Sequence, residues 1–240
     1  MNHTKQLIED YTNGNRNFLS INLQEVSLES INLSGADFSN SDFSNADLTN
    51  TNLCGVNLSN ANLSGANLVG ANLSEANLTG AKLGEANLSN ANLSGANLSE
   101  IDANRAFFFC TNLSQVVLDR AFLFSASLSY VCLIGARVRY VSLIGANLVG
   151  ADLSYADLTG SYLIVTDLSS ANLSDANLSL VDLNSSNLSG ADLTKANFNG
   201  ADLSRVNLVD ANLSQVDLKN AKLVDAILSD GIDYQPVCKS

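Results

Sequence analysis

The sequence predicts an all-β protein whose chain coils as a solenoid of square cross-section, and three observations support this prediction. Every fifth residue from Phe18 to Leu228 is apolar, at 43 consecutive positions of which 36 are Leu and 5 are Phe. The residue two places earlier is small, and it is Ala at 25 of the 43 positions. The pentapeptides fill residues 16–230 without one insertion. A period of five fits neither an α-helix, with about 3.6 residues per turn, nor a flat strand.

The other positions of each pentapeptide predict a bend. Asn or Asp precedes the large apolar residue, Ser or Thr follows it, and Gly often comes next, as in Ala61-Asn62-Leu63-Ser64-Gly65. These residue types favour tight turns and local hydrogen bonds between side chain and backbone. Four such bends close a square coil of 20 residues, with Leu and Ala inside and Asn or Asp outside as a solubilising surface. Successive coils then stack through strand-like hydrogen bonds about 4.8 Å apart.

This pattern resembles the pentapeptide-repeat family, whose motif is A(D/N)LxX, over about 90% of the chain. The resemblance implies a right-handed quadrilateral β-helix. Nearly eleven coils at the spacing of paired strands would give a rod of ~50 Å. We therefore assign residues 1–15 to an N-terminal helical cap, residues 16–230 to the β-helix, and residues 231–240 to a C-terminal cap or tail.

The two end segments are predicted to close the solenoid. Residues 3–13 predict a short α-helix with Leu7, Ile8 and Tyr11 on one side and Asn13-Gly14 as its stop. A terminal coil without a cover exposes its core and its strand edge, so the helix is expected to cover the first coil. The tail at 232–236 could cover the last coil at the C-terminal end of the solenoid.

Composition excludes several classes of function. With 24 acidic and 12 basic residues, the net charge of −12 disfavours nucleic acid as a ligand. His3 is the only histidine and no phosphate-binding glycine motif is present, so we expect no enzyme activity, no cofactor and no metal site. No apolar run reaches the ~18 residues of a membrane span. The N-terminus lacks a signal segment and the cysteines lack CxxC spacing, which predicts a cytoplasmic protein with free thiols.

One stretch, between Ile101 and Val165, departs from the polar pattern at its outward positions. Aromatic and aliphatic side chains replace Asn, Ser and Gly there, and four of the six arginines fall within 35 residues. Exposed aromatics beside Arg are typical of binding hot spots, and exposed apolar patches mark interfaces. The residues that we assign to this candidate protein-binding patch are Arg105, Phe107, Phe109, Arg120, Phe122, Phe124, Arg137, Arg139, Tyr140, Ile144, Tyr162 and Ile164.

Two other interpretations of this stretch stay open at the level of sequence. The outward positions could have drifted without a function. Alternatively, Ala103 at a Leu position and the run Phe107-Phe108-Phe109 could mark a local break that tucks some aromatics under others.

These features predict a non-enzymatic scaffold that binds an unidentified protein, without direct contact to nucleic acid or membrane, and as a monomer. Arg137 and Arg139 are expected to form a basic edge that favours an acidic, partly apolar partner.

Residues 11–25 are similar to cyanobacterial family members of the type that regulates heterocyst differentiation, which implies a regulatory role in cell differentiation. The alternative is a DNA-mimicking inhibitor of DNA gyrase, as in the quinolone-resistance branch of the family. The net charge of this chain amounts to about −1.1 per coil. Duplex DNA carries roughly 2.8 negative charges over the same length, so the chain reaches less than half of that charge density.

Overall fold

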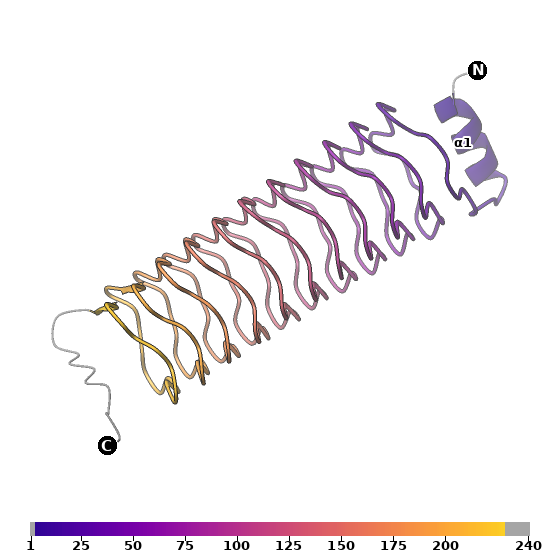
Figure 1. The fold of residues 1–240 in the computed structure, drawn as a ribbon. Coiled ribbons are helices and arrows are strands. Elements are labelled where there is room, and N and C mark those ends of the chain that lie inside the picture. The colour runs from indigo at the N-terminus through magenta and orange to yellow at the C-terminus, as the bar shows by residue number, and fades with distance from the viewer. Residues whose placement is uncertain (1–2, 229–240) are drawn as a thin grey trace.

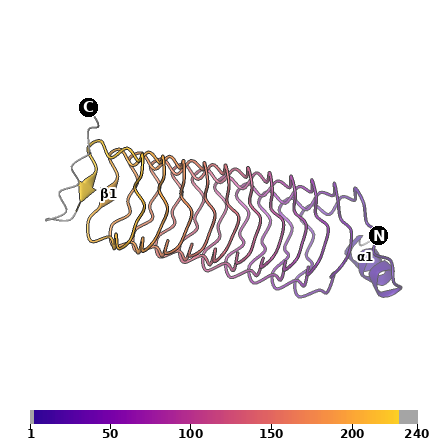
Figure 2. The same ribbon diagram turned by 90° about the horizontal axis from the view of Figure 1, so that it is seen from below.

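The structure is a computed structural model that describes residues 3–228 as a rod of stacked coils with one helix at its N-terminal end (Figures 1 and 2). The elements follow one another as α1 (His3–Thr12), β1 (Asn207–Leu208) and β2 (Ile227–Leu228), and the two strands pair in parallel. Elsewhere successive coils pair through isolated parallel bridges between residues 20 apart, such as Asn62 with Lys82. Four bridges per coil, each five residues from the next, confirm the predicted four-sided coil. No helix within residues 3–228 is long and apolar enough to cross a bilayer.

Hydrogen bonds within and between coils explain why the chain bends every five residues. In one repeat, Leu63 N–H donates to the carbonyl of Lys82 in the next coil at 2.7 Å, and Gly65 N–H donates to that of Gly84 at 2.9 Å. Ala66 N–H closes the bend onto the carbonyl of Leu63 at 3.0 Å. The third residue of the bend has a positive φ at all 42 corners from residue 20 to residue 225, and 12 of these corners are Gly. A bond of this kind around a positive φ at the third position is the pattern of a type II β-turn.

The core is a continuous stack of the large apolar residues and the small residues two places before them. Phe18 stacks on Phe38 with ring centroids 5.2 Å apart, and Phe38 meets Phe43 edge to face. The exception at Ala103 keeps the register, because Ala103 and Ile101 are both fully buried and simply exchange the small and large positions. Bridges join residue 102 to residues 82 and 122 on either side. The local break considered from the sequence is therefore wrong.

Six of the small inward positions carry a hydroxyl group, and each one is buried with a hydrogen bond. Thr51 Oγ1 donates to the carbonyl of Leu28 at 2.7 Å, and Thr111 Oγ1 donates to that of Leu88 at 2.7 Å. The same bond, to the carbonyl 23 residues earlier, is made by Ser41, Ser161, Thr166 and Ser186. A hydroxyl is tolerated inside the rod because its proton always meets a carbonyl of the preceding coil.

The Asn and Asp positions have a structural role that the sequence interpretation missed. Asn62 Oδ1 accepts a hydrogen bond from the N–H of Ser64 at 3.2 Å, and Asn62 Nδ2 donates to Asp42 Oδ1 at 3.1 Å. Similar bonds join other side chains 20 residues apart, such as Asn72 to Asn52. These side chains are half-buried and link one coil to the next, so describing them only as a solubilising surface was wrong.

Helix α1 covers the first coil, as the sequence predicts. Leu7 is buried against the core, and Tyr11 Oη donates to the carbonyl of Ser34 at 2.9 Å. The guanidinium of Arg16 lies 3.7 Å from the centroid of the Tyr11 ring and donates to the Tyr11 carbonyl at 2.8 Å. This contact with the helix explains why Arg16 stands at a position that is otherwise small. The predicted C-terminal cap, within residues 231–240, lies outside the described residues.

Candidate functional site

The four sides of the rod provide a frame for the candidate patch. We name them by the core residues of the middle coils, in chain order: face A through Leu118 and Val138, face B through Leu123, Leu143 and Leu163, face C through Phe108 and Leu128, and face D through Leu113 and Leu133. On each face, the residue before the core residue stacks directly over its counterpart in the next coil. The predicted patch lies on faces A, B and C.

Face B carries the longest apolar strip. Phe122 is 54% exposed, Phe124 is 47% exposed and Tyr162 is 51% exposed. Ile144 and Ile164 are half-buried and follow Phe124 in the same column. The corner residue Val165 is 60% exposed and has a φ of 56°. The structure therefore places the predicted face B residues outward and together.

Face C adds a second aromatic group one step round the rod. Phe107 and Phe109 point outward while Phe108 between them is fully buried, so none of the outward rings is tucked inside. The Phe109 ring meets that of Tyr130 edge to face, with centroids 5.9 Å apart. Edge-to-face packing fixes both rings without hiding them from solvent.

Corner tyrosines extend the exposed aromatic surface, and the sequence analysis missed most of them. A Cβ atom built on Gly150 would lie 2.6 Å from Tyr130, and one built on Gly160 would lie 2.6 Å from Tyr140. Each of these tyrosines therefore lies across the corner of the following coil, where only Gly leaves room for the ring. For Tyr130 and Tyr140, the signal that could have found them is a large corner residue with Gly 20 positions later; Tyr155 lacks this signal, because Asp175 stands at that place. Tyr140 was assigned to the patch, whereas Tyr130 and the exposed Tyr155 were not.

The four arginines of the patch are paired with carboxylates. Arg105 lies 3.6 Å from Glu85, and Arg120 lies 3.9 Å from Glu100, in each case one coil away. On face A, Asp119 Oδ2 lies 2.9 Å from Arg137 Nε and 2.7 Å from Arg139 Nη2.

Asp119, Arg137 and Arg139 form a cluster, which we call the Asp119 cluster, and its charges hold the Asp119 carboxyl in the ionised form. Burial acts to raise the pKa of Asp119, but hydrogen bonds from Arg139 and the charges of both arginines outweigh it and lower the pKa. The same interactions raise the pKa of Arg139. All four arginines lie in ion pairs, so the predicted basic edge is largely neutralised, and the preference for an acidic partner stays a prediction.

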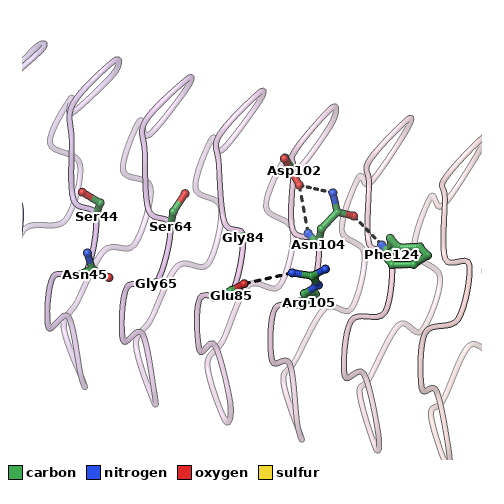
Figure 3. A pocket seen from close by; sticks show the side chains of 10 residues that line it. All are labelled: Ser44, Asn45, Ser64, Gly65, Gly84, Glu85, Asp102, Asn104, Arg105 and Phe124. Carbon is green, nitrogen blue, oxygen red and sulfur yellow. Dashed lines mark hydrogen bonds and ion pairs between the residues drawn. The ribbon is translucent and has the colours of Figure 1, made fainter.

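A shallow groove of about 630 Å³ runs along face B up to the apolar strip (Figure 3). One column of this face forms the floor of the groove and contains Ser44, Ser64, Gly84, Asn104 and Phe124. The floor is lowest at Gly84, which has no side chain, and the groove ends against the Phe124 ring. Asn104 holds this end of the groove. Its backbone N–H and Nδ2 donate to Asp102 Oδ1, while its Oδ1 accepts the N–H of Phe124 at 2.8 Å.

The arrangement suits binding better than chemistry. No three His, Cys, Asp or Glu side chains in residues 3–228 lie close enough to hold a metal ion. Cys54, Cys110 and Cys132 are free thiols. What the middle coils present is a set of exposed rings on a regularly paired backbone.

Comparison with known protein families shows to which family this chain belongs. The model for pentapeptide repeats matches residues 21–60, 57–95, 71–108, 132–169, 162–200 and 191–230. This chain belongs to the pentapeptide-repeat family. The family resemblance inferred from the sequence is thereby confirmed.

The sequence and the fold of this chain are also similar to those of several solved structures. HetL, a protein involved in heterocyst differentiation regulation from the cyanobacterium Nostoc sp. strain PCC 7120, is 38% identical over 96% of this chain and 98% of HetL, with a TM-score of 0.53. A trypsin-treated form of QnrB1, a plasmid-mediated fluoroquinolone resistance protein, is 18% identical over 89% of this chain and 92% of its own, with a TM-score of 0.42. Rfr23 from the cyanobacterium Cyanothece 51142 is 21% identical over 94% of this chain and 99% of its own, with a TM-score of 0.23. No curated protein matches the sequence significantly. For this pentapeptide-repeat chain, membership of the family implies the right-handed coil that the sequence analysis expected.

Proposed function

We propose that this pentapeptide-repeat protein is a non-enzymatic regulatory scaffold that binds a protein partner through faces B and C of its middle coils. The observation that carries the proposal is the concentration of exposed large apolar side chains. Of the 14 that the described residues present, ten lie between Phe107 and Val165. The rest of the rod is covered by Asn, Asp, Ser and Gly, so its fold does not require such rings at outward positions, and exposed apolar patches mark interfaces.

The regulatory part of the proposal is supported by likeness to HetL. The identity of 38% extends over nearly the whole of both chains. We therefore propose a role in cyanobacterial cell differentiation. We also propose a monomer that works in the cytoplasm, without direct contact to nucleic acid or membrane.

The proposed function is tested by the double substitution Phe122→Ser and Phe124→Ser. Since both rings are about half exposed, the unfolding midpoint should change little. Partner capture from a cyanobacterial extract should be lost, because each hot-spot aromatic contributes ~2 kcal/mol or more. The readout is quantitative mass spectrometry of proteins retained by the immobilised chain, with a thermal melt of each variant.

A matched control removes two exposed apolar residues outside the patch. Leu19→Ser with Leu180→Ser takes away similarly exposed side chains, 48% and 65%, from other coils. This control should retain the partner. A Phe variant that stays folded and captures every protein that the parent captures would refute the proposed function.

A further inference from the structure

We propose that the face B strip between Asp102 and Asp182 receives an α-helical segment of the partner, lying along the rod axis, with apolar residues in its middle and Lys or Arg at both ends. This inference rests on the proposed function and names the chemistry of the partner. Figure 3 shows one end of the strip, where Asp102 and Phe124 line the groove.

The first argument is the order of charges in one column. Consecutive bridges join Asp102 to Phe122, Phe122 to Ser142, Ser142 to Tyr162, and Tyr162 to Asp182. This stretch of the column thus has a carboxylate at each end and the rings of Phe122 and Tyr162 on either side of Ser142 between them, over four coil steps or about 19 Å. Beyond its ends the column continues with Lys82 and Asp202. Within residues 3–228, Asp102 and Asp182 take part in none of the ion pairs, unlike Glu85 and Asp119. Asp102 Oδ1 accepts hydrogen bonds from Asn104, and Asp182 Oδ1 accepts the N–H of Asn184, so the Oδ2 atom of each carboxylate is the one that would pair with a cation of the partner.

The second argument is that face B offers no backbone groups to an extended strand. Phe122 N–H donates to the carbonyl of Ile101 at 2.9 Å, and Tyr162 N–H donates to that of Val141 at 2.9 Å. Phe124 N–H is taken by Asn104 Oδ1. A peptide that joined by β-augmentation would leave its own backbone groups without partners, whereas a helix satisfies its hydrogen bonds internally.

The third argument is the fit of length and shape. A helix rises about 1.5 Å per residue, so cations that reach both carboxylates stand about 13 residues apart. The groove before Phe124 gives the side chain at one end of the helix access to Asp102, because Gly84 leaves the floor of the column low. Phe122, Phe124 and Tyr162 then lie beneath the apolar middle of the helix.

The probe is a fluorescein-labelled synthetic amphipathic helix of about 20 residues, with an apolar stripe between two lysines about 13 residues apart. A panel varies the lysine spacing, replaces Lys by Glu, or interrupts the helix with Pro. Fluorescence anisotropy with the full chain should show saturable binding that is strongest near the calculated spacing. Binding should be lost on interruption by Pro. Phe122→Ser with Phe124→Ser should also abolish it.

Charge-reversal variants locate the two ends. Asp102→Lys and Asp182→Lys should each weaken the affinity about fivefold, as expected for one exposed ion pair. Asp152→Lys, at the same pentapeptide position but on face D, makes the same change in net charge and should alter the affinity less than twofold. Lys82 and Lys222 already occupy this position in other coils, so lysine is compatible with the fold. The peptide with Glu in place of Lys should bind the double variant, Asp102→Lys with Asp182→Lys, better than the parent.

The outcomes separate this inference from the proposed function. Absence of saturable binding across the panel, equal loss with Asp152→Lys, or preference for the peptide interrupted by Pro would overturn the helical inference. In each of these cases the Phe122 and Phe124 capture experiment would still decide whether the patch binds a protein. Unchanged partner capture by that Phe variant would instead remove the proposed function itself.

Discussion

At the scale of the residue, the corner position imposes the strongest constraint on this chain. All 42 corners have a positive φ, and 30 of them carry a side chain. Asn, Asp and Gly tolerate this conformation, while a β-branched residue strongly resists it. Val165, at the edge of the patch, is the one β-branched residue among these corners. Strained residues of this kind are concentrated at functional sites.

We expect Val165→Asn to stabilise the rod by about 1 kcal/mol, because Asn relieves the backbone strain. Chemical unfolding followed by circular dichroism measures this effect. Val149→Asn is the matched control, since Val149 stands one place before a corner and has no positive φ. An equal effect of the two substitutions would show that Val165 is not strained.

A core substitution tests the inward assignment. Leu73 is fully buried, so Leu73→Ala should lose roughly 2–5 kcal/mol. Asn72→Ser should lose about 1 kcal/mol, since Asn72 Oδ1 accepts the N–H of Ser74 and Asn72 Nδ2 donates to Asn52. The measurement is denaturant unfolding of both variants beside the parent. Equal losses would contradict the assignment of inward and outward positions.

The contrast between these two residues shows what sequence alone could predict. The five-residue period places Leu73 inside without any structure, because only one position of each repeat is consistently large and apolar. The role of Asn72 depends on a second side chain 20 residues away, and that pair is visible only once the coil length is used to align the chain with itself.

At the scale of the element, the end helix and the faces of the rod were predictable to different degrees. The expected helix at 3–13 is observed as α1 (His3–Thr12), because its apolar side and its Asn-Gly stop are local signals. The columns of the patch were also predictable, since the coil length fixes which residues stack. The ion pair of Arg139 with Asp119 follows the same rule, because the two residues are 20 apart, but the sequence analysis did not use it. Arg137 reaches Asp119 across neighbouring columns, a contact that the coil length does not fix.

The Asp119 cluster predicts a dependence of stability on pH. The folded-state pKa of Asp119 is lowered, so its contribution is present above the pKa of the unfolded chain, about 3.9, and is lost as pH falls through the lower folded-state pKa. Asp119→Asn should therefore reduce the unfolding temperature at pH 7 and reduce it less near pH 2.5, where the carboxylate of the unfolded chain is already protonated. Asp217→Asn, on the same face but outside this cluster, serves as the control. An Asp119→Asn defect of equal size at both pH values would contradict the role of the carboxylate charge.

At the scale of the whole molecule, charge is distributed unevenly along the rod. Residues 103–139 contain four arginines and one acidic residue, whereas residues 140–194 contain six aspartates and no Lys or Arg. Those six aspartates are spread over all four faces, and the arginines of the middle coils neutralise carboxylates of their neighbours. The sequence analysis predicted the low overall charge density, but it missed the ion pairs at a spacing of 20 residues that compensate the most basic stretch.

This distribution leads us to expect no strong inhibition of DNA gyrase. A mimic of duplex DNA has to present roughly 2.8 negative charges for each coil height of about 4.8 Å, in continuous rows. The net charge of −12 over about eleven coils falls well below that density, and the rows are interrupted in the middle of the rod by apolar side chains on face B. A supercoiling assay with purified gyrase and this protein measures the effect, with an established DNA-mimicking inhibitor as the positive control. Inhibition at sub-micromolar concentration would favour the quinolone-resistance function over the regulatory scaffold. If Phe122→Ser with Phe124→Ser then abolished that inhibition, the apolar strip rather than the acidic faces would be the surface that contacts gyrase.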